Sequence, residues 1–428
     1  MNAKQRVWQV SPEKRSSLAF LSLLCFALAD VRDGLGPFFG VWLQSRGWTP
    51  DAIGFAMTLG GLAGMLCTTP LGALADHTPH KRALLGLGTT LMALSCGMVF
   101  LWTGAWAVSL SIILQGAAAA AFMPALTGIT LGLVGQDGLA TRLGTNAAWN
   151  HCGNAFTAAL GGMIGYFYGI PGVFFVLALM AVLAVFSLIR INPAQINYAA
   201  ARGLDAPDSR GHREEPMGAK RLFADKALLA VALTLFFFHL GNAALLPLLG
   251  QSAVAQFNVN PAVYTAGTVI LAQVTMIVCA LWGARTARKH GYGPLFLTAL
   301  AVLPLRGCIA GLWESPWNII PVQVLDGVGA GLMGVATPGL TARILQGSGR
   351  INMGLGLVLT IQGVGAALSN AYGGLFAHHV SYGSAFFALA AAPCLGLVIF
   401  VATARFSPVL ARAIRCAEPW AEASSNPL

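Results

Sequence analysis

The sequence predicts an all-α membrane protein with twelve transmembrane helices in two pseudo-symmetric six-helix bundles. Three observations lead to this fold class: an apolar composition, apolar windows that recur along the whole chain, and an internal repeat. The 428 residues are 56% hydrophobic and 9% charged, with a mean hydropathy of +0.71. Soluble cores of this length cannot bury so much apolar side chain, so lipid is expected to be the main solvent.

Twelve apolar windows are long enough to cross a hydrocarbon core about 30 Å thick. They cover residues 17–43, 50–74, 83–103, 106–130, 141–166, 171–190, 226–250, 261–283, 293–312, 317–342, 351–376 and 382–404. A porin-like barrel would show short alternating segments instead. The basic residues gather between windows on one side, so the positive-inside rule places both termini in the cytoplasm. A bacterial inner (cell) membrane is the expected location, and no basic stripe suggests a nucleic-acid partner.

A charged stretch at residues 191–225 is too polar to span and is expected to form a cytoplasmic central loop. It separates an N-terminal half (1–190) from a C-terminal half (226–404), which a cytoplasmic tail follows (405–428). The halves resemble each other at a shift of 210 to 212 residues. Matching pairs are Pro37 with Pro247, Pro50 with Pro261, Gly72 with Gly283, Gln115-Gly116 with Asp326-Gly327, and Gly172 with Gly383. A near-constant shift at separate places predicts a duplicated fold.

The loop between the second and third windows reads GALADHTPHKRALL. Its first residue, Gly72, permits close packing of helix ends, and the carboxylate of Asp76 can interact with a helix N-terminus or a basic side chain. The loop resembles the G-x-L-x-D-x-x-G-x-[RK]-[RK] motif of the major facilitator superfamily, with matches at Gly72, Leu74, Asp76, Lys81 and Arg82. The resemblance extends over essentially the whole chain. Pro79 replaces the usual glycine, and the second-half copy at Gly283 lacks the acidic residue.

The resemblance implies a secondary active transporter that moves a small organic solute by alternating access. We expect proton coupling, with export favoured over uptake, and a monomer without cofactor, metal ion or enzymatic activity. The family pattern implies that spans 1, 4, 7 and 10 line the cavity and that spans 2, 5, 8 and 11 join the halves. It also favours a conformational latch, in which Asp76 approaches the start of span 11 near Gly349, Arg350 and Ile351 when the cavity is open outward.

Charged residues within the first window are candidates for proton or substrate handling, because ionisable groups are costly at membrane depth. Asp30, Arg32 and Asp33 lie there, and the two carboxylates share one helical face. The equivalent depth of the seventh window holds His239 and Asn242, and the shift of 210 residues pairs Asn242 with Arg32. We expect both sets to face one cavity. A neutralised ion pair that only locks helices together is the alternative.

Asn146, Asn150 and Asn154 form a stripe along the fifth window. Interhelical hydrogen bonding and cavity lining both explain such a stripe, and Gln115 in the fourth window is a candidate for either role. Span 4 lacks the arginine that many relatives carry upstream of Gln115, because Ile112 is there. Span 5 lacks a Gly-Pro pair, which argues against a standard drug–proton antiporter.

Asp326 in the tenth window and Arg306 in the ninth lie at similar expected depths. If they pair, Asp326 is expected to be structural; if Arg306 extends toward the lipid headgroups, Asp326 becomes a second proton carrier. The alternatives to export are a solute uptake symporter, a solute sensor and a membrane-embedded enzyme. The last is disfavoured because the sequence contains no HExxH, GxSxG or Walker motif.

Overall fold

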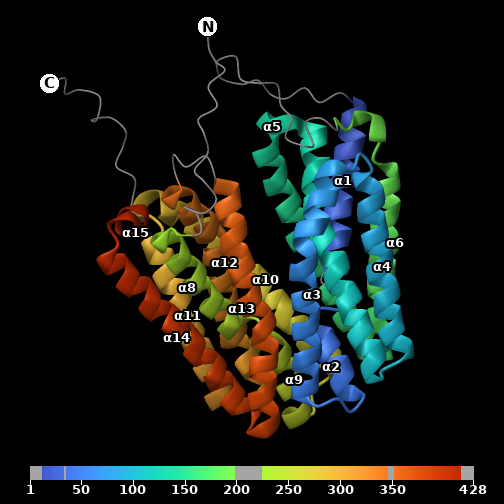
Figure 1. The fold of residues 1–428 in the computed structure, drawn as a ribbon. Coiled ribbons are helices and arrows are strands. Elements are labelled where there is room, and N and C mark those ends of the chain that lie inside the picture. The colour runs from blue at the N-terminus through green and yellow to red at the C-terminus, as the bar shows by residue number, and fades with distance from the viewer. Residues whose placement is uncertain (1–11, 33–34, 198–223, 346–350, 416–428) are drawn as a thin grey trace, which may run out of the picture. The chain divides into compact units, whose positions relative to one another are not determined.

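The computed structural model describes residues 12–32, 35–197, 224–345 and 351–415 (Figure 1). Every regular element in these ranges is a helix. Ten helical stretches among them are long and apolar enough to cross a membrane. The predicted fold class, an all-α membrane protein, is therefore confirmed.

The first half of the chain folds into helices that follow the predicted windows closely. They are α1 (Pro12–Arg32), α2 (Pro37–Ser45), α3 (Pro50–His77), α4 (Lys81–Leu101), α5 (Ala105–Tyr168), α6 (Pro171–Arg190) and the short η1 (Pro193–Gln195). The 64 residues of α5 are two helices joined across a break at Gly135, where φ is +69°. Glycine adopts this left-handed backbone without steric cost. The helices of the fourth and fifth windows are therefore separated by a single non-helical residue.

The second half contains the corresponding set of helices. They are α8 (Lys226–Asn242), α9 (Leu245–Phe257), α10 (Pro261–His290), α11 (Gly293–Leu312), η3 (Pro316–Asn318), α12 (Ile319–Ile344), α13 (Ile351–His379), α14 (Tyr382–Phe406) and α15 (Pro408–Ala413). Asp225 and Asn260 cap α8 and α10, and each side chain accepts two backbone N–H bonds. Such caps satisfy donors that the first turn of a helix leaves free.

Two of the twelve predicted windows are absent from the ten stretches that pass the hydropathy test. The window at 17–43 forms α1 and α2, and α1 includes Asp30 and Arg32. The window at 141–166 forms the second part of α5, which carries the asparagine stripe. Charges and amides lower the hydropathy of these helices, so the count of twelve spans stays a prediction.

Contacts divide the chain into two compact units, residues 1–39 with 62–211 and residues 40–61 with 212–428. In the first unit, α1 packs on α5 and α6, and α4 packs on the same two helices. In the second unit, α8 packs on α13 and α14, while α11 packs on α12 and α14. The helices that the internal repeat makes equivalent thus have equivalent neighbours.

In each unit a glycine allows two helices to approach closely at equivalent positions. A Cβ added at Gly153 of α5 would lie 2.1 Å from the carbonyl oxygen of Phe26 on α1. A Cβ added at Gly365 of α13 would lie 2.2 Å from the carbonyl oxygen of Phe236 on α8. These glycines differ by 212 residues and the phenylalanines by 210, so the predicted shift also relates the packing.

The repeat also relates the fourth and tenth windows. An added Cβ at Gly64 would lie 3.1 Å from the carbonyl oxygen of Gly116, and one at Gly327 would lie 2.5 Å from the Cβ of Thr275. Both Gly116 and Thr275 lie 211 residues from their counterparts, Gly327 and Gly64. The pairing of Gln115 with Asp326 thus has structural support.

The first part of α3 belongs to the second unit and packs on α13. The hydroxyl of Thr58 donates to the carbonyl oxygen of Ala367 (2.7 Å) and accepts from the backbone N–H of Ala371 (3.0 Å). At Gly54, an added Cβ would lie 2.2 Å from the carbonyl oxygen of Asn370. Small and hydroxylated residues allow backbones to approach closely in lipid, where helices otherwise gain little from association.

We expect Thr58→Val to lower the free energy of unfolding by about 1–3 kcal/mol, because it removes a buried hydroxyl that serves two backbone groups. Thermal unfolding of the purified protein measures this effect. Thr68→Val is the matched control on the same helix, since the exposed Thr68 hydroxyl bonds only to Gly64 of its own helix. Equal losses in both variants would contradict a special role for Thr58.

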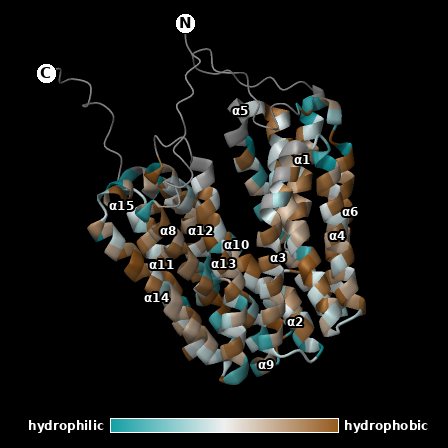
Figure 2. Ribbon diagram, viewed as in Figure 1, coloured by the Kyte–Doolittle hydropathy of each residue, from teal (hydrophilic) through white to brown (hydrophobic). Residues whose placement is uncertain are grey.

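Each half ends with a short helix after its last long one. Asn192 caps η1 and Ser407 caps α15, and a proline follows each cap. The backbone N–H of Asn197 donates to the carbonyl oxygen of Gly132, and that of Gly293 donates to the carbonyl oxygen of Ile414. Figure 2 shows hydrophobic residues along α6 and α14 and hydrophilic residues near α15, as expected where a membrane span ends.

Candidate functional site

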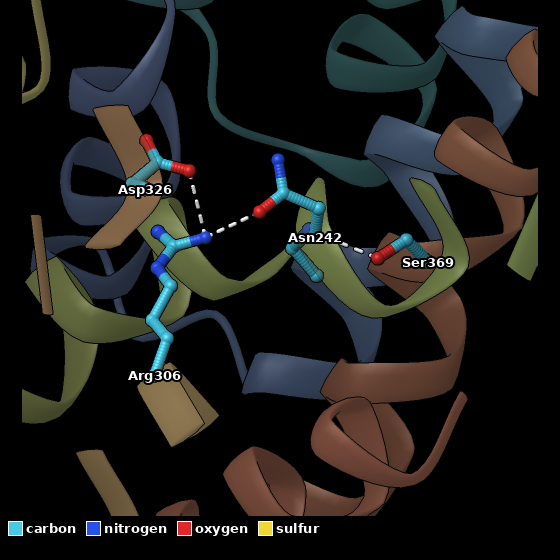
Figure 3. Close-up of polar contacts among 5 residues, drawn as sticks. Asn242, Arg306, Asp326 and Ser369 are labelled. Atoms are coloured by element: carbon cyan, nitrogen blue, oxygen red, sulfur yellow. Dashed lines mark hydrogen bonds and ion pairs between the residues drawn. The ribbon is translucent and has the colours of Figure 1, made fainter. Parts of the chain in front are cut away.

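The second unit contains a buried cluster of three polar side chains from three helices (Figure 3). Nη1 of Arg306, on α11, lies 2.8 Å from Oδ1 of Asp326 on α12. The same nitrogen donates to the side-chain oxygen of Asn242, the last residue of α8. The Arg306 side chain is fully buried, and that of Asp326 is 10% exposed. The ion pair that the sequence left undecided therefore forms.

A backbone contact fixes the end of α8 beside this cluster. The N–H of Ala244 donates to the hydroxyl of Ser369 on α13, at 2.9 Å (Figure 3). Ser369 is fully buried, so the bond satisfies a donor that the break between α8 and α9 leaves free. Asn242 is consequently held where its amide reaches Arg306.

Among the buried polar atoms of this unit that have no hydrogen-bond partner in the described residues, four lie beside the cluster or one turn from it. They are Nε and Nη2 of Arg306 and both amide atoms of Gln323, which is one turn before Asp326 on α12. Buried guanidinium groups need compensation, because removing charge from water costs several kcal/mol. Asp326 supplies the compensating charge, and Asn242 supplies a neutral acceptor.

The first unit has a neutral network at the equivalent positions. Gln115 donates to the hydroxyl of Ser111 (2.8 Å), and Ser111 donates to the carbonyl oxygen of Ser95 (2.6 Å). Ser95 and Arg306 lie 211 residues apart, as do Gln115 and Asp326. The two halves thus place polar groups at matching sites, and the counterparts of the ion pair, Ser95 and Gln115, are uncharged.

Two of the three charged candidates in the first window, Asp30 and Arg32, lie on α1. Nη1 of Arg32 lies 3.9 Å from the sulfur of Met123 on α5. The half-buried Asp30 carboxylate is close enough to the Cys96 thiol on α4 for electrostatic interaction. Asp33 lies outside the described residues. Arg32 thus faces α5.

The two candidate residues on α8, His239 and Asn242, have different neighbours in the structure. His239 is half-buried, and its ring lies against Phe238 with 5.1 Å between centroids. Asn242 uses its acceptor within its own unit, on Arg306. The sequence reasoning placed Asn242 toward a shared cavity and did not foresee this partner, because helix periodicity does not show how far an arginine on another helix extends.

The asparagine stripe of α5 has one buried member. Asn146 donates to the hydroxyl of Thr130 at 3.0 Å, a bond that joins the two parts of α5 across the Gly135 break. Asn150 and Asn154 are half-buried. The interhelical bond is the kind that the packing interpretation expects, and cavity lining by the other two asparagines stays a prediction.

The residues of the loop motif lie at the ends of α3 and α4. An added Cβ at Gly72 would meet no described atom within 4 Å, whereas one at Gly283 would lie 3.0 Å from a Leu332 methyl group. Close packing at Gly72 thus has no partner among the described atoms and stays a prediction. The side chain of Asp76 lies outside the described part of the chain, as do Gly349 and Arg350.

The two basic residues of the motif form contacts within the first unit. Lys81 is 1% exposed and donates to the carbonyl oxygen of Ala75. Arg82 donates to the carbonyl oxygens of Leu188 (2.8 and 3.0 Å) and Ile189 (3.0 Å), at the end of α6. A cation at a helix C-terminus is favourable because carbonyl groups there lack helical partners. These bonds fix the start of α4 against α6.

Comparison with known proteins gives the class of this fold. The solved structure of the nucleoside transporter NupG resembles it with a TM-score of 0.70 and 17% identity, and the match covers 92% of this chain and 99% of NupG. A bacterial homologue of the human lysosomal transporter Spinster resembles it with a TM-score of 0.69 and 13% identity, and the match covers 96% of this chain and 100% of that one. At these identities the likeness shows the fold alone, which is that of membrane transporters.

Residues 18–305 match the sequence profile of the Major Facilitator Superfamily, and the chain belongs to this family. An uncharacterized MFS-type transporter of Mycobacterium tuberculosis (strain H37Rv) is 37% identical over 382 residues, which cover 89% of this chain and 91% of that protein. The cephamycin export protein CmcT of Amycolatopsis lactamdurans is 34% identical over 105 residues, 24% of this chain and 21% of that protein. The chain is thus an integral membrane transporter of this family.

Proposed function

We propose that this chain is a proton-linked secondary transporter that moves a small organic solute by alternating access. The observation that carries the proposal is the set of polar and charged side chains buried at matching positions of two duplicated helical units. Lipid does not tolerate such groups without partners, and in transporters they mark substrate or proton pathways. The first unit has an uncharged network at Gln115 and Ser111, and the second unit has an ion pair between Arg306 and Asp326.

Asp30 is the proposed proton carrier. Asp326 pairs with a fully buried guanidinium 2.8 Å away, so a role as proton carrier would leave the charge of Arg306 uncompensated. Asp30 is half-buried in the first helix, and an ionisable group at membrane depth is a candidate for proton handling. Asp33, Arg32 and His239 are proposed to act with it on substrate or proton.

The protein is proposed to be a monomer in a bacterial inner membrane, with both termini cytoplasmic because of the positive-inside rule. Export is favoured over uptake. The support for export is the partial similarity to a protein named as a cephamycin exporter, together with the family resemblance. An uptake symporter is the second candidate, since it needs the same buried charges.

The experiment uses purified protein and two steps. A thermal-shift panel of sugars, amino acids, organic acids, nucleosides, dipeptides and a cephamycin first identifies the solute, because a ligand of the folded state raises the melting temperature. Solute flux driven by a proton gradient is then measured in proteoliposomes, and a pH-sensitive dye inside them reports the accompanying proton movement. The direction of the proton movement that accompanies solute entry separates export by antiport from uptake by symport.

We expect Asp30→Asn to lower proton-driven flux at least tenfold and to leave solute counterflow intact, because counterflow needs binding and reorientation without net proton movement. Glu314→Gln, which changes an exposed carboxylate in the connection after α11, is the matched control and should behave like wild type. Normal proton-driven flux in Asp30→Asn would exclude this residue as the carrier. Loss of both activities would assign it to binding or folding.

A further inference from the structure

The last three turns of α14 line a shallow, open hollow of about 610 Å³ on the second unit. Leu397, Val398, Val401, Ala402, Arg405 and Phe406 line it. Val398 and Phe406 are 64% and 81% exposed, although both are large and apolar. In a membrane span such exposure is directed at acyl chains, so the lining is suited to hydrocarbon.

One cation lies within this apolar lining, and a second follows on the next helix. Arg405 is exposed, and within the described part of the chain no hydrogen bond or ion pair engages its guanidinium. Arg412 of α15 is also exposed, with Nε donating to the carbonyl oxygen of Pro408 at 3.2 Å. Both arginines lie where the span ends, at the level of lipid headgroups.

The arginine at the end of α6 in the first unit has different neighbours. Arg190 is the last residue of α6 and Arg405 the last but one of α14, and the caps Asn192 and Ser407 follow each arginine by two residues. The guanidinium of Arg190 lies over two aromatic rings, 5.4 Å from the centroid of Phe20 and 5.7 Å from that of Phe186. These rings occupy the space beside the cation and engage it by cation–π attraction.

The residue one turn before the arginine differs between the ends of α6 and α14. Val401 is one turn before Arg405, whereas Phe186 is one turn before Arg190. A valine cannot reach over the guanidinium as a phenylalanine does, so the hollow stays open and the cation stays available.

We propose that this hollow binds an anionic phospholipid, with an acyl chain along Val398 and Val401 and the headgroup phosphate paired with Arg405. Arginine matches the geometry of phosphate by presenting paired N–H donors, and a nearby second cation strengthens the attraction. An apolar groove of this length is recognised by hydrocarbon, so a free phosphate ion would gain only part of the contact.

Native mass spectrometry of the purified full-length protein tests the proposal with dioleoyl phosphatidylglycerol and dioleoyl phosphatidylcholine at equal concentration. We expect wild type to retain the anionic lipid over the zwitterionic one, and Arg405→Gln to reduce this preference about fivefold, the effect expected for one cation near an anionic surface. Val401→Phe should reduce it as well, because the ring would fill the hollow and cover the guanidinium as in the first unit.

Arg190→Gln is the matched control and should leave lipid retention unchanged. An equal loss in Arg190→Gln would mean that general interfacial charge selects the lipid, which would overturn the proposal. Complete displacement of the lipid by millimolar glycerol 3-phosphate would identify a site for soluble anions instead. A dimer that Val401→Phe dissociates would assign the surface to a second copy of the chain.

Discussion

The Asp326→Asn variant is expected to lose about 3–5 kcal/mol of stability, because it leaves the fully buried guanidinium of Arg306 without a compensating charge. Asn242 would remain as an acceptor, but a neutral amide does not offset a buried cation. The measurement is the free energy of unfolding in mixed micelles, supported by the melting temperature of the purified protein. Solute counterflow should fall in proportion to the fraction of folded protein.

Gln115→Leu is the matched control, since Gln115 takes the place of Asp326 in the first unit and belongs to a neutral network. Its loss should be about 1 kcal/mol, the contribution of an ordinary hydrogen bond. The double variant Arg306→Met, Asp326→Leu should recover most of the stability that Asp326→Asn loses, because no buried charge remains. If Asp326→Asn were as stable as wild type, another group would have to compensate the charge of Arg306.

Gly365→Leu is expected to prevent the accumulation of folded protein. An added Cβ alone would lie 2.2 Å from the carbonyl oxygen of Phe236, so α13 and α8 would have to move apart. Gly365→Ala should be recoverable but less stable by about 1–3 kcal/mol, the usual cost of overpacking. Size-exclusion profiles and melting temperatures of the detergent-purified proteins measure both effects.

Gly356→Ala is the control on the same helix, because an added Cβ there would meet nothing within 4 Å. It should be neutral or slightly stabilising, since alanine favours helix over glycine by up to about 1 kcal/mol. Gly153→Ala in the first unit should behave like Gly365→Ala, as the repeat requires. Tolerance of leucine at Gly365 would show that these helices do not pack as closely as described.

Hydropathy and the repeat predicted most of the fold. The apolar windows became helices, and the shift of 210 to 212 residues located even the close contacts of Gly153 and Gly365, because duplicated helices keep the small residues on which their packing depends. The break of the first window near residue 36 and the single-residue join at Gly135 were not predicted. Both depend on local backbone angles, which hydropathy does not report.

The candidate site was less predictable than the fold. Asp326 and Arg306 were recognised as a potential pair because their depths matched, and the ion pair forms. Asn242 was recognised as polar at membrane depth, but its partner was not, since the reach of a long arginine side chain depends on helix rotation. Ser95 and Ser111 were overlooked because single serines in apolar windows carry no distinctive pattern, although the repeat places Ser95 opposite Arg306 in the alignment of the halves.

The packing of α3 on α13 has a consequence for the order of folding. The Thr58 hydroxyl bonds to Ala367, 309 residues later in the chain, so its partners are synthesised only after most of the protein has entered the membrane. Until then the glycine-rich face near Gly54 has no helix to cover it. Contacts between such distant residues close slowly and form late. The second predicted span, α3, is therefore inserted but incompletely packed until the next-to-last span, α13, has been synthesised.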